Sequence, residues 1–160
     1  MNRSIMVFAA FVLGAGAARA ETWGTITANW QGEEQTWFVT AKDGESQSSH
    51  DDSAKVIDSF TLWGNPQETD LAATGNAILL GFYVMRGPMG KEAHGKDFHY
   101  LLSGFADKWE AGEEDTEVSL ELFDKTDTTV HVRGTFEASP MREGETTRVE
   151  GVFDVTFPLD

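Results

Sequence analysis

The chain has 160 residues, of which 40% are hydrophobic, and its 27 acidic side chains outnumber 12 lysines and arginines, for a formal charge of -15 at pH 7. Because the sequence has no cysteine, it excludes disulfides, thiolate metal centres, cysteine nucleophiles and a lipid-modified N-terminal cysteine. The length fits one globular domain, and the acidic balance argues against nucleic acid and anionic membrane surfaces as partners.

Residues 1–20 have the order of a secretory signal peptide. Arg3 supplies a positive start, residues 5–13 form an unbroken apolar run, and Ala18-Arg19-Ala20 is a small-x-small cleavage site. The run is too short to span a hydrocarbon core about 30 Å thick as a stable helix. We therefore expect cleavage after Ala20, export to the periplasm or medium of a bacterium, and no stable membrane insertion of the mature domain, residues 21–160. Cleavage removes the two positive charges of Arg3 and Arg19 and so lowers the formal charge from -15 to -17.

Beyond the signal, apolar residues alternate with polar ones in short runs separated by turn residues, which is the pattern of antiparallel strands. Ile26, Ala28 and Trp30, for example, share one face of the first run, and helices should be scarce. Eight strands are predicted, at residues 26–30, 36–41, 56–63, 77–85, 98–105, 118–123, 130–138 and 149–157.

The connections between these strands differ in character. Residues 42–53 are polar and are predicted to form an exposed, mobile loop. One helical turn fits residues 67–75. Residues 86–96 contain several glycines and a proline and are predicted as a long loop, whereas residues 106–115 are acidic and polar apart from Trp109.

Two of the strands allow finer predictions. Residues 77–85 are almost entirely apolar, so both faces of this strand are expected to be covered, as in the middle of a sheet. In the run 118–123, Val118, Leu120 and Leu122 are expected to share one face.

The last two strands repeat a short pattern. Residues 132–138 and 149–155 both read Val-x-Gly-x-Phe-acid-small. Each glycine is expected to leave room on the inward face for a bulky neighbour, with the phenylalanines at equivalent depth. The predicted fold class is therefore all-β, with about eight antiparallel strands in one domain. A β-sandwich is favoured over a closed calycin-like barrel, although the pattern alone does not separate the two.

The ends of the mature chain resemble a known group of proteins. Gly134-Thr135-Phe136-Glu137-Ala138, then a polar hairpin and Gly151-Val152-Phe153-Asp154-Val155, resembles the closing strands of small exported bacterial β-sandwich proteins of unknown function. The opening Gly24-Thr25-Ile26-Thr27-Ala28, with Gly32 and Trp37, resembles their first hairpin. The resemblance implies a β-sandwich and an envelope location, and it carries no catalytic or binding residue. Many such proteins begin with a lipid-bearing cysteine, which this chain lacks.

Four histidines are possible metal ligands, namely His50, His94, His99 and His131. His94 and His99 lie close in sequence, and His50-Asp51-Asp52 is a possible remote contributor. On a strand, Asp97 and His99 would point to the same face. A transition-metal site needs three or four converging ligands, and surface histidines without a metal are the favoured interpretation.

The aromatic residues offer a second kind of site. Trp30, Trp37 and Trp63 fall on expected inward faces and are assigned to the core. Trp23, at the mature N-terminus, and Trp109, in an acidic segment, are the candidates for exposed contacts with a carbohydrate.

Motifs of catalysis and metal binding are not found in the chain. The acidic runs at residues 110–117 and 124–127 lack the spacing of a calcium-binding loop and are interpreted as solvated surface charge. No G-x-S-x-G elbow, H-E-x-x-H motif or glycine-rich phosphate loop occurs. We therefore predict no enzymatic activity, no cofactor, and no catalytic or metal-binding residue.

These observations predict an exported, non-enzymatic binding or accessory module of the bacterial envelope, whose partner is an unknown envelope protein or small ligand. One alternative is a calycin-like carrier of a small apolar ligand, motivated by the apolar run of residues 78–85 and the many phenylalanines. The other alternative is a metal-binding envelope protein built on His94 and His99.

Overall fold

The computed structural model describes residues 20–87 and 91–159. Over these residues the chain forms twelve strands and one short 3-10 turn. Their bounds, in chain order, are β1 (Glu21–Trp30), β2 (Glu33–Ala41), β3 (Ser49–Asp51), β4 (Ile57–Gly64), β5 (Ala77–Met85), β6 (Ala93–Leu101), β7 (Lys108–Ala111), η1 (Glu113–Asp115), β8 (Thr116–Lys125), β9 (Thr129–Ala138), β10 (Met141–Arg142), β11 (Glu145–Thr146) and β12 (Val149–Pro158).

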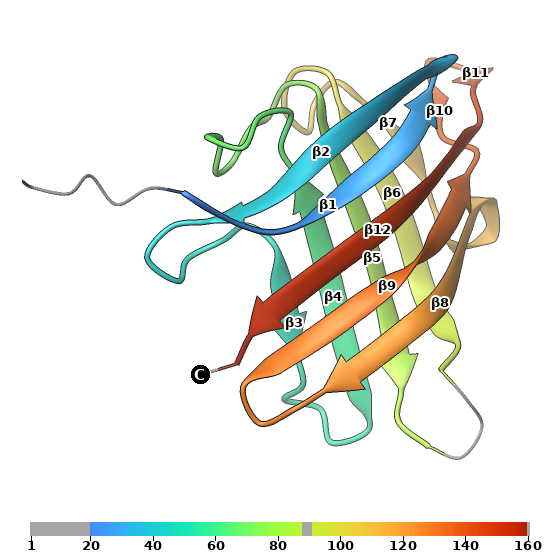
Figure 1. Cartoon of the computed structure of the whole chain (residues 1–160). Coiled ribbons are helices and arrows are strands. Elements are labelled where there is room, and N and C mark those ends of the chain that lie inside the picture. The colour runs from blue at the N-terminus through green and yellow to red at the C-terminus, as the bar shows by residue number, and fades with distance from the viewer. Residues whose placement is uncertain (1–19, 88–90, 160) are drawn as a thin grey trace, which may run out of the picture.

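The strands form two antiparallel sheets that face each other as a β-sandwich (Figure 1). One sheet has the order β2-β1-β12-β9-β8, and the other has the order β11-β10-β7-β6-β5-β4-β3. The all-β prediction and the preference for a sandwich are therefore confirmed. The calycin-like barrel is wrong as a fold, because the two sheets stay separate rather than closing into one.

Alternation builds the core, because every second residue of the long strands points between the sheets. β5 contributes Ile78 and Leu80, and β12 contributes Phe153 and Val155, all at most 1% exposed. Phenylalanines from the two sheets meet in this space, where the ring centroids of Phe82 and Phe153 lie 5.6 Å apart. Burying each such side chain stabilises the fold by about 1.5–3 kcal/mol. Packed side chains thus occupy the space in which a calycin-like carrier would hold an apolar molecule.

The repeated pattern of the last two strands pairs glycines with phenylalanines. Gly134 of β9 lies opposite Phe153 of β12, and Gly151 of β12 lies opposite Phe136 of β9. A Cβ atom on Gly134 would lie 2.9 Å from Phe153, and one on Gly151 would lie 2.6 Å from Phe136. Both rings are buried to a similar depth. The expectation that each glycine leaves room for a bulky neighbour is confirmed.

The structure adds four short strands, β3, β7, β10 and β11, to the eight predicted ones. Residues 42–53 were predicted to be an exposed, mobile loop, but they contain β3 and the buried Ser48. The Oγ of Ser48 accepts a hydrogen bond from the backbone N–H of Trp63 at 2.7 Å, which ties this segment to β4. Residues 106–115 contain β7 and η1. The polar composition of these segments hid the pairing, because short strands bury too few apolar residues to show alternation.

β6 also differs from its predicted bounds. It begins at Ala93, inside the predicted loop 86–96, and it ends at Leu101 rather than Phe105. Residues 88–90 of that loop lie outside the described residues.

β8 contains a bulge that changes which side chains face the core. Its pairing with β9 shifts between Leu120 and Leu122, which leaves Glu121 as an extra residue. One extra residue reverses the alternation of a strand. Phe123 therefore turns inward, where its ring lies 6.0 Å from that of Phe60. Leu122 does not share the inner face with Leu120, contrary to the prediction.

β5 lies between β4 and β6, as predicted for the middle of a sheet. Its inner face packs in the main core, and Ala77 and Leu79 on its outer face are buried in a second cluster. Trp63 belongs to this outer cluster, so it is buried but not in the main core as expected. Ala73 covers the cluster from residues 67–75, a segment of bends and turns without the predicted helical turn.

The predicted signal peptide lies outside the described residues except for Ala20. β1 begins at Glu21, directly after the predicted cleavage site. In the part of the chain that the structure describes, we find no helix of the length and apolar character that a membrane crossing requires.

Candidate functional site

One end of the sandwich holds a network of charged side chains around the buried carboxylate of Asp58. We call the set His50, Asp52, Asp58, Arg86 and Lys125 the charge network. His50 lies on β3, Asp58 lies on β4, and Arg86 directly follows β5, all in the seven-stranded sheet. Lys125 ends β8 in the other sheet, and the bulge in β8 is what turns it inward. The network therefore joins the two layers.

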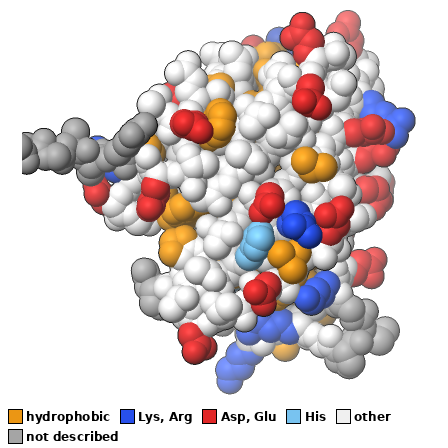
Figure 2. All heavy atoms as spheres, in the orientation of Figure 1, with side chains coloured by type: hydrophobic (Ala, Val, Ile, Leu, Met, Phe, Trp, Pro, Cys, Tyr) orange, Lys and Arg blue, Asp and Glu red, His pale blue; other side chains and the backbone are white. Residues whose placement is uncertain are grey.

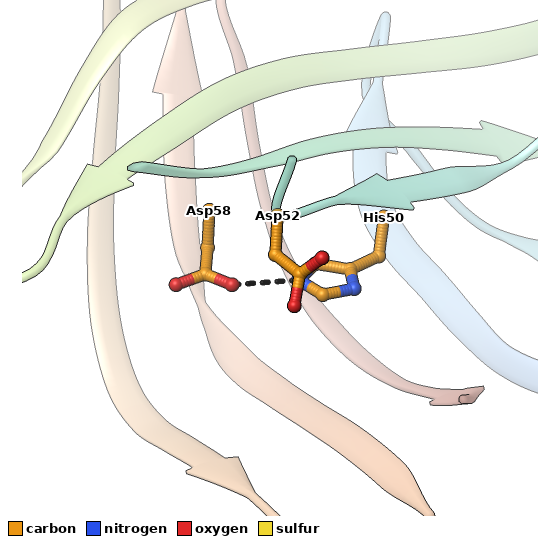
Figure 3. A group of neighbouring side chains, drawn as sticks. All are labelled: His50, Asp52 and Asp58. Atoms are coloured by element: carbon orange, nitrogen blue, oxygen red, sulfur yellow. Dashed lines mark hydrogen bonds and ion pairs between the residues drawn. The ribbon is translucent and has the colours of Figure 1, made fainter. Parts of the chain in front are cut away.

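Asp58 is the centre of the charge network. The Arg86 guanidinium donates from Nε to Asp58 Oδ2 at 2.5 Å and from Nη2 to Oδ1 at 2.9 Å. Lys125 Nζ donates to Asp58 Oδ1 at 3.1 Å and to Asp52 Oδ2 at 2.5 Å. His50 Nε2 lies 2.8 Å from Asp58 Oδ1 (Figure 3), where the ring donates because an ionised carboxylate only accepts.

These contacts keep Asp58 ionised. Asp58 is 0% exposed, and burial by itself raises the pKa of a carboxyl. Hydrogen bonds from Arg86, His50 and Lys125 outweigh burial and hold the pKa of Asp58 well below its ordinary value. The pKa of Asp52 is also lowered, mainly by its hydrogen bond to Lys125. At neutral pH the Asp58 carboxylate is therefore a fixed negative charge and not a proton donor.

The charge network also contains three groups of the kind that bind metals. Ligand atoms of His50, Asp52 and Asp58 lie within 4.8 Å of one another. Both oxygens of Asp58 already accept hydrogen bonds from Arg86, and Lys125 bridges Asp58 and Asp52. A metal ion would have to displace these two cations from the same oxygens. The donor set thus fits an ion-pair network better than a metal centre.

A hollow opens to solvent beside the charge network. This end hollow has a volume of about 530 Å³. Its wall includes His50, Asp52 and Lys125 from the network, together with Trp23 and Phe157. The rings of Trp23 and Phe157 meet edge to face, with centroids 5.9 Å apart. The end hollow therefore combines an aromatic wall with charged and hydrogen-bonding groups.

The other histidines lie elsewhere. His94 and His99 point away from the core, because their chain neighbours Ala93 and Phe98 are buried in it. The His99 ring pairs with Asp97 at 2.9 Å, as the shared face predicted. Within residues 20–87 and 91–159, neither His94 nor His99 belongs to a group of three possible metal ligands. His131 pairs with an aspartate on the outer face of the five-stranded sheet.

The two candidate tryptophans have different surroundings. Trp109 is only 7% exposed and packs edge to face on Trp30 at a centroid distance of 5.9 Å, so the prediction of an exposed contact is wrong. It lies on β7, a strand too short for alternation to identify. Trp23 is half-buried, and it lines the end hollow.

The acidic runs are surface charge, as expected. Residues 112–115 and Glu117 are exposed, and Lys108 Nζ donates to Glu110 at 2.8 Å. Among the described residues, neither run supplies a group of three possible metal ligands. On the face seen in Figure 2, hydrophobic side chains are scattered among polar ones, and acidic side chains follow one edge. That face offers no broad apolar surface to a partner.

The structure brings together residues that sequence reasoning treated separately. His50 and Asp52 were named only as remote contributors to a metal site, and Asp58, Arg86 and Lys125 were not identified. In β4, Asp58 lies on the same inward face as Phe60 and Leu62. A carboxylate at an inward position was therefore the signal in the sequence that could have identified the network. The end of the sandwich can hold a small polar molecule through hydrogen bonds and aromatic contact.

Comparison with known proteins found no match for this chain. No protein-family model, no curated protein and no solved structure matches it.

Proposed function

We propose that the protein is an exported, non-enzymatic binding module of the bacterial envelope, and that the end hollow is its binding surface. The observation that carries this proposal is the concave site of about 530 Å³ in which Trp23 lies near His50, Asp52 and Lys125. Small-molecule sites combine an apolar wall with a few placed polar groups, and this hollow has both. The packed core leaves the surface hollow as the better place for a ligand.

Three features support export. Residues 1–20 have the charged, apolar and small-residue regions of a signal peptide. Cleavage after Ala20 leaves every residue of β1 in place, because this strand starts at Glu21. A fold held by its apolar core needs no disulfide after export, which agrees with the absence of cysteine.

Export is tested by expressing the full chain in a bacterium and sequencing the N-terminus of the protein in each cell fraction. We expect a chain that starts at Glu21 in the periplasm or medium. The matched control carries Ala18→Asp and Ala20→Asp, which remove the small-x-small site, and it should keep its first residues. A protein that stays in the cytosol with Met1 in place contradicts the proposal.

Binding is tested by native mass spectrometry, with elemental analysis, of the protein purified from that fraction, followed by crosslinking in the intact envelope. A mass excess, or a crosslinked partner that is lost when Trp23 is replaced, supports a binding module. A bare mass together with no crosslinked partner contradicts it.

A further inference from the structure

Trp23 separates two neighbouring hollows. The pairing of β1 with β2 shifts between Thr22 and Gly24, so Trp23 is the extra residue of a bulge, a feature that re-aims a side chain. On one side lies the end hollow. On the other side lies a hollow of about 780 Å³ formed by residues 42–48 with Leu71, which we call the loop hollow. Trp23 and Ser48 line both hollows, so the two lie side by side, and we call the pair the trough.

The polar groups of the trough have the chemistry of a site for a neutral, hydroxyl-rich molecule. Its carboxylates outnumber its amines, with Asp43, Glu45, Asp52 and Asp127 against Lys42 and Lys125. That balance disfavours an anionic ligand. Serine, threonine and glutamine side chains supply further donors and acceptors, and Trp23, Leu71 and Leu159 are among the residues that supply apolar surface. A large apolar ligand would therefore leave many polar groups without partners.

Several of these groups are free to bind a ligand. Asp43 and Gln47 are exposed in the loop hollow, and Ser49 and Asp127 are exposed in the end hollow. Over the described part of the chain, no side-chain hydrogen bond or ion pair engages any of the four. Hydrogen-bond donors and acceptors are thus available on both sides of Trp23.

The backbone around the loop hollow is already held in place. The backbone N–H groups of Lys42 and Glu45 each donate to the other residue's carbonyl at 2.9 Å. Ser46 Oγ donates to the carbonyl of Thr40 at 2.6 Å and accepts from the N–H of Ser48 at 3.0 Å. A site that is fixed before binding loses less conformational entropy when a ligand enters.

We propose that this trough binds a neutral oligosaccharide whose neighbouring sugar units lie on either side of Trp23. The inference rests on the proposed function and names the ligand class of the same surface. A sugar ring has an apolar C–H face that packs on an indole and hydroxyl groups that bond to carboxylates, amides and hydroxyls. The two hollows and the shared tryptophan match a chain of two or more sugars.

The test is isothermal titration of the exported, purified protein with four tetrasaccharides, namely chitotetraose, cellotetraose, maltotetraose and xylotetraose. We expect one or more to bind, and Trp23→Ala to weaken that binding by about tenfold or more. The matched control is Phe105→Ala, which removes an aromatic ring that is 52% exposed and lies outside the trough, and it should bind as the wild type does.

Trp23 packs on Phe157, so its replacement also risks the fold. Two exposed variants, Gln47→Ala in the loop hollow and Asp127→Ala in the end hollow, avoid this risk. Each should weaken tetrasaccharide binding by about threefold or more, because each removes a hydrogen-bonding partner. A monosaccharide occupies one side only, so no more than one of the two variants should affect it.

Two results overturn the inference: no tetrasaccharide binds to the folded protein, or one binds with an affinity that all three trough variants leave unchanged. The proposed function is judged separately. If native mass spectrometry finds a different ligand that is lost in Trp23→Ala, the binding module stands and the carbohydrate is wrong. If no tetrasaccharide binds, and no other ligand and no envelope partner is found, both fail.

Discussion

Asp58 carries its negative charge inside the sandwich, where the residue is 0% exposed. A buried carboxylate is tolerated only when other groups compensate its lost hydration. Arg86, His50 and Lys125 do so here. The cations themselves are partly exposed, with 38% of the Arg86 side chain and 26% of the Lys125 side chain open to solvent. Solvent therefore limits the cost of losing Asp58.

We predict that Asp58→Asn lowers the free energy of unfolding by about 2 kcal/mol, because the amide keeps the shape but cannot match the charge of Arg86. Urea unfolding monitored by tryptophan fluorescence measures this change. The control is Glu121→Gln, which removes an exposed ion pair with Arg133 at 3.5 Å and should cause no measurable change. Equal losses of unfolding free energy in the two variants would mean that the buried Asp58 contributes no more to stability than an exposed carboxylate does.

Acid should weaken the fold partly through Asp58. Its pKa in the folded chain lies below the ordinary value of about 3.9 that applies in the unfolded chain. Between these two values the unfolded state binds more protons, so stability falls as the pH drops. The contribution is complete above about pH 5. Urea unfolding of the wild type and Asp58→Asn should show a difference that shrinks from about pH 5 to about pH 3. A difference that stays constant would show that Asp58 has an ordinary pKa.

At the scale of the strands, the close packing of β9 against its neighbours depends on Gly134. A Cβ on Gly134 would lie 2.2 Å from the carbonyl oxygen of Ser119 and 2.9 Å from Phe153. Neither neighbour can move without disturbing β8 or the core. The pairing of three strands in register therefore requires a residue without a side chain at this position.

We predict that Gly134→Ala lowers the midpoint of urea unfolding and destabilises the fold by about 1–3 kcal/mol through overpacking. Gly112→Ala is the control, because a Cβ there meets nothing within 4 Å and the backbone is extended at φ -90°. It should leave stability unchanged or raise it by about 0.4–1 kcal/mol. If Gly134→Ala is as stable as Gly112→Ala, β8 and β9 do not approach each other as closely at Gly134 as the structure shows.

Alternation was sufficient to predict the long strands of this fold. Most of them place at least three apolar residues on one face, as β12 does with Phe153, Val155 and Phe157. β7 has four residues and only Trp109 and Ala111 inward, so its pattern is too short to read. The bulges at Trp23 and Glu121 have no local signature, because each depends on how the strand pairs with its neighbour.

The candidate site was less predictable than the fold. Its members come from β1, β3, β4, β8 and the residues after β5, which only the topology brings together. Trp23 was identified from its place near the predicted mature N-terminus. Lys125 was hidden because the bulge reverses its expected direction. Local patterns therefore indicate single residues, and the network depends on long-range pairing.

The whole molecule carries a strong excess of negative charge. The 27 acidic side chains face only 12 lysines and arginines, and cleavage at the predicted site after Ala20 would increase the imbalance. Like charges on one compact domain repel each other, and dissolved salt screens this repulsion. The folded state should therefore gain stability from moderate ionic strength.

We predict that the Tm rises by a few degrees between about 0.01 M and 0.15 M NaCl, as measured by differential scanning calorimetry. A variant with Glu68→Lys and Glu114→Lys, two exposed positions, keeps the contacts of the core but carries less net charge. The rise in Tm with salt should be smaller in this variant than in the wild type. A Tm that falls with salt in the wild type would mean that exposed ion pairs outweigh the general repulsion.

The first and last strands of the domain are neighbours. β1 pairs with β12 from Gly24 to Asn29, and β12 in turn pairs with β9. The five-stranded sheet is incomplete until residues 149–158 reach their place between β1 and β9. While the C-terminal segment is still being synthesised, β1 has only β2 as a partner in this sheet. Closing this sheet therefore requires contacts between the two ends of the domain, and such non-local contacts slow folding.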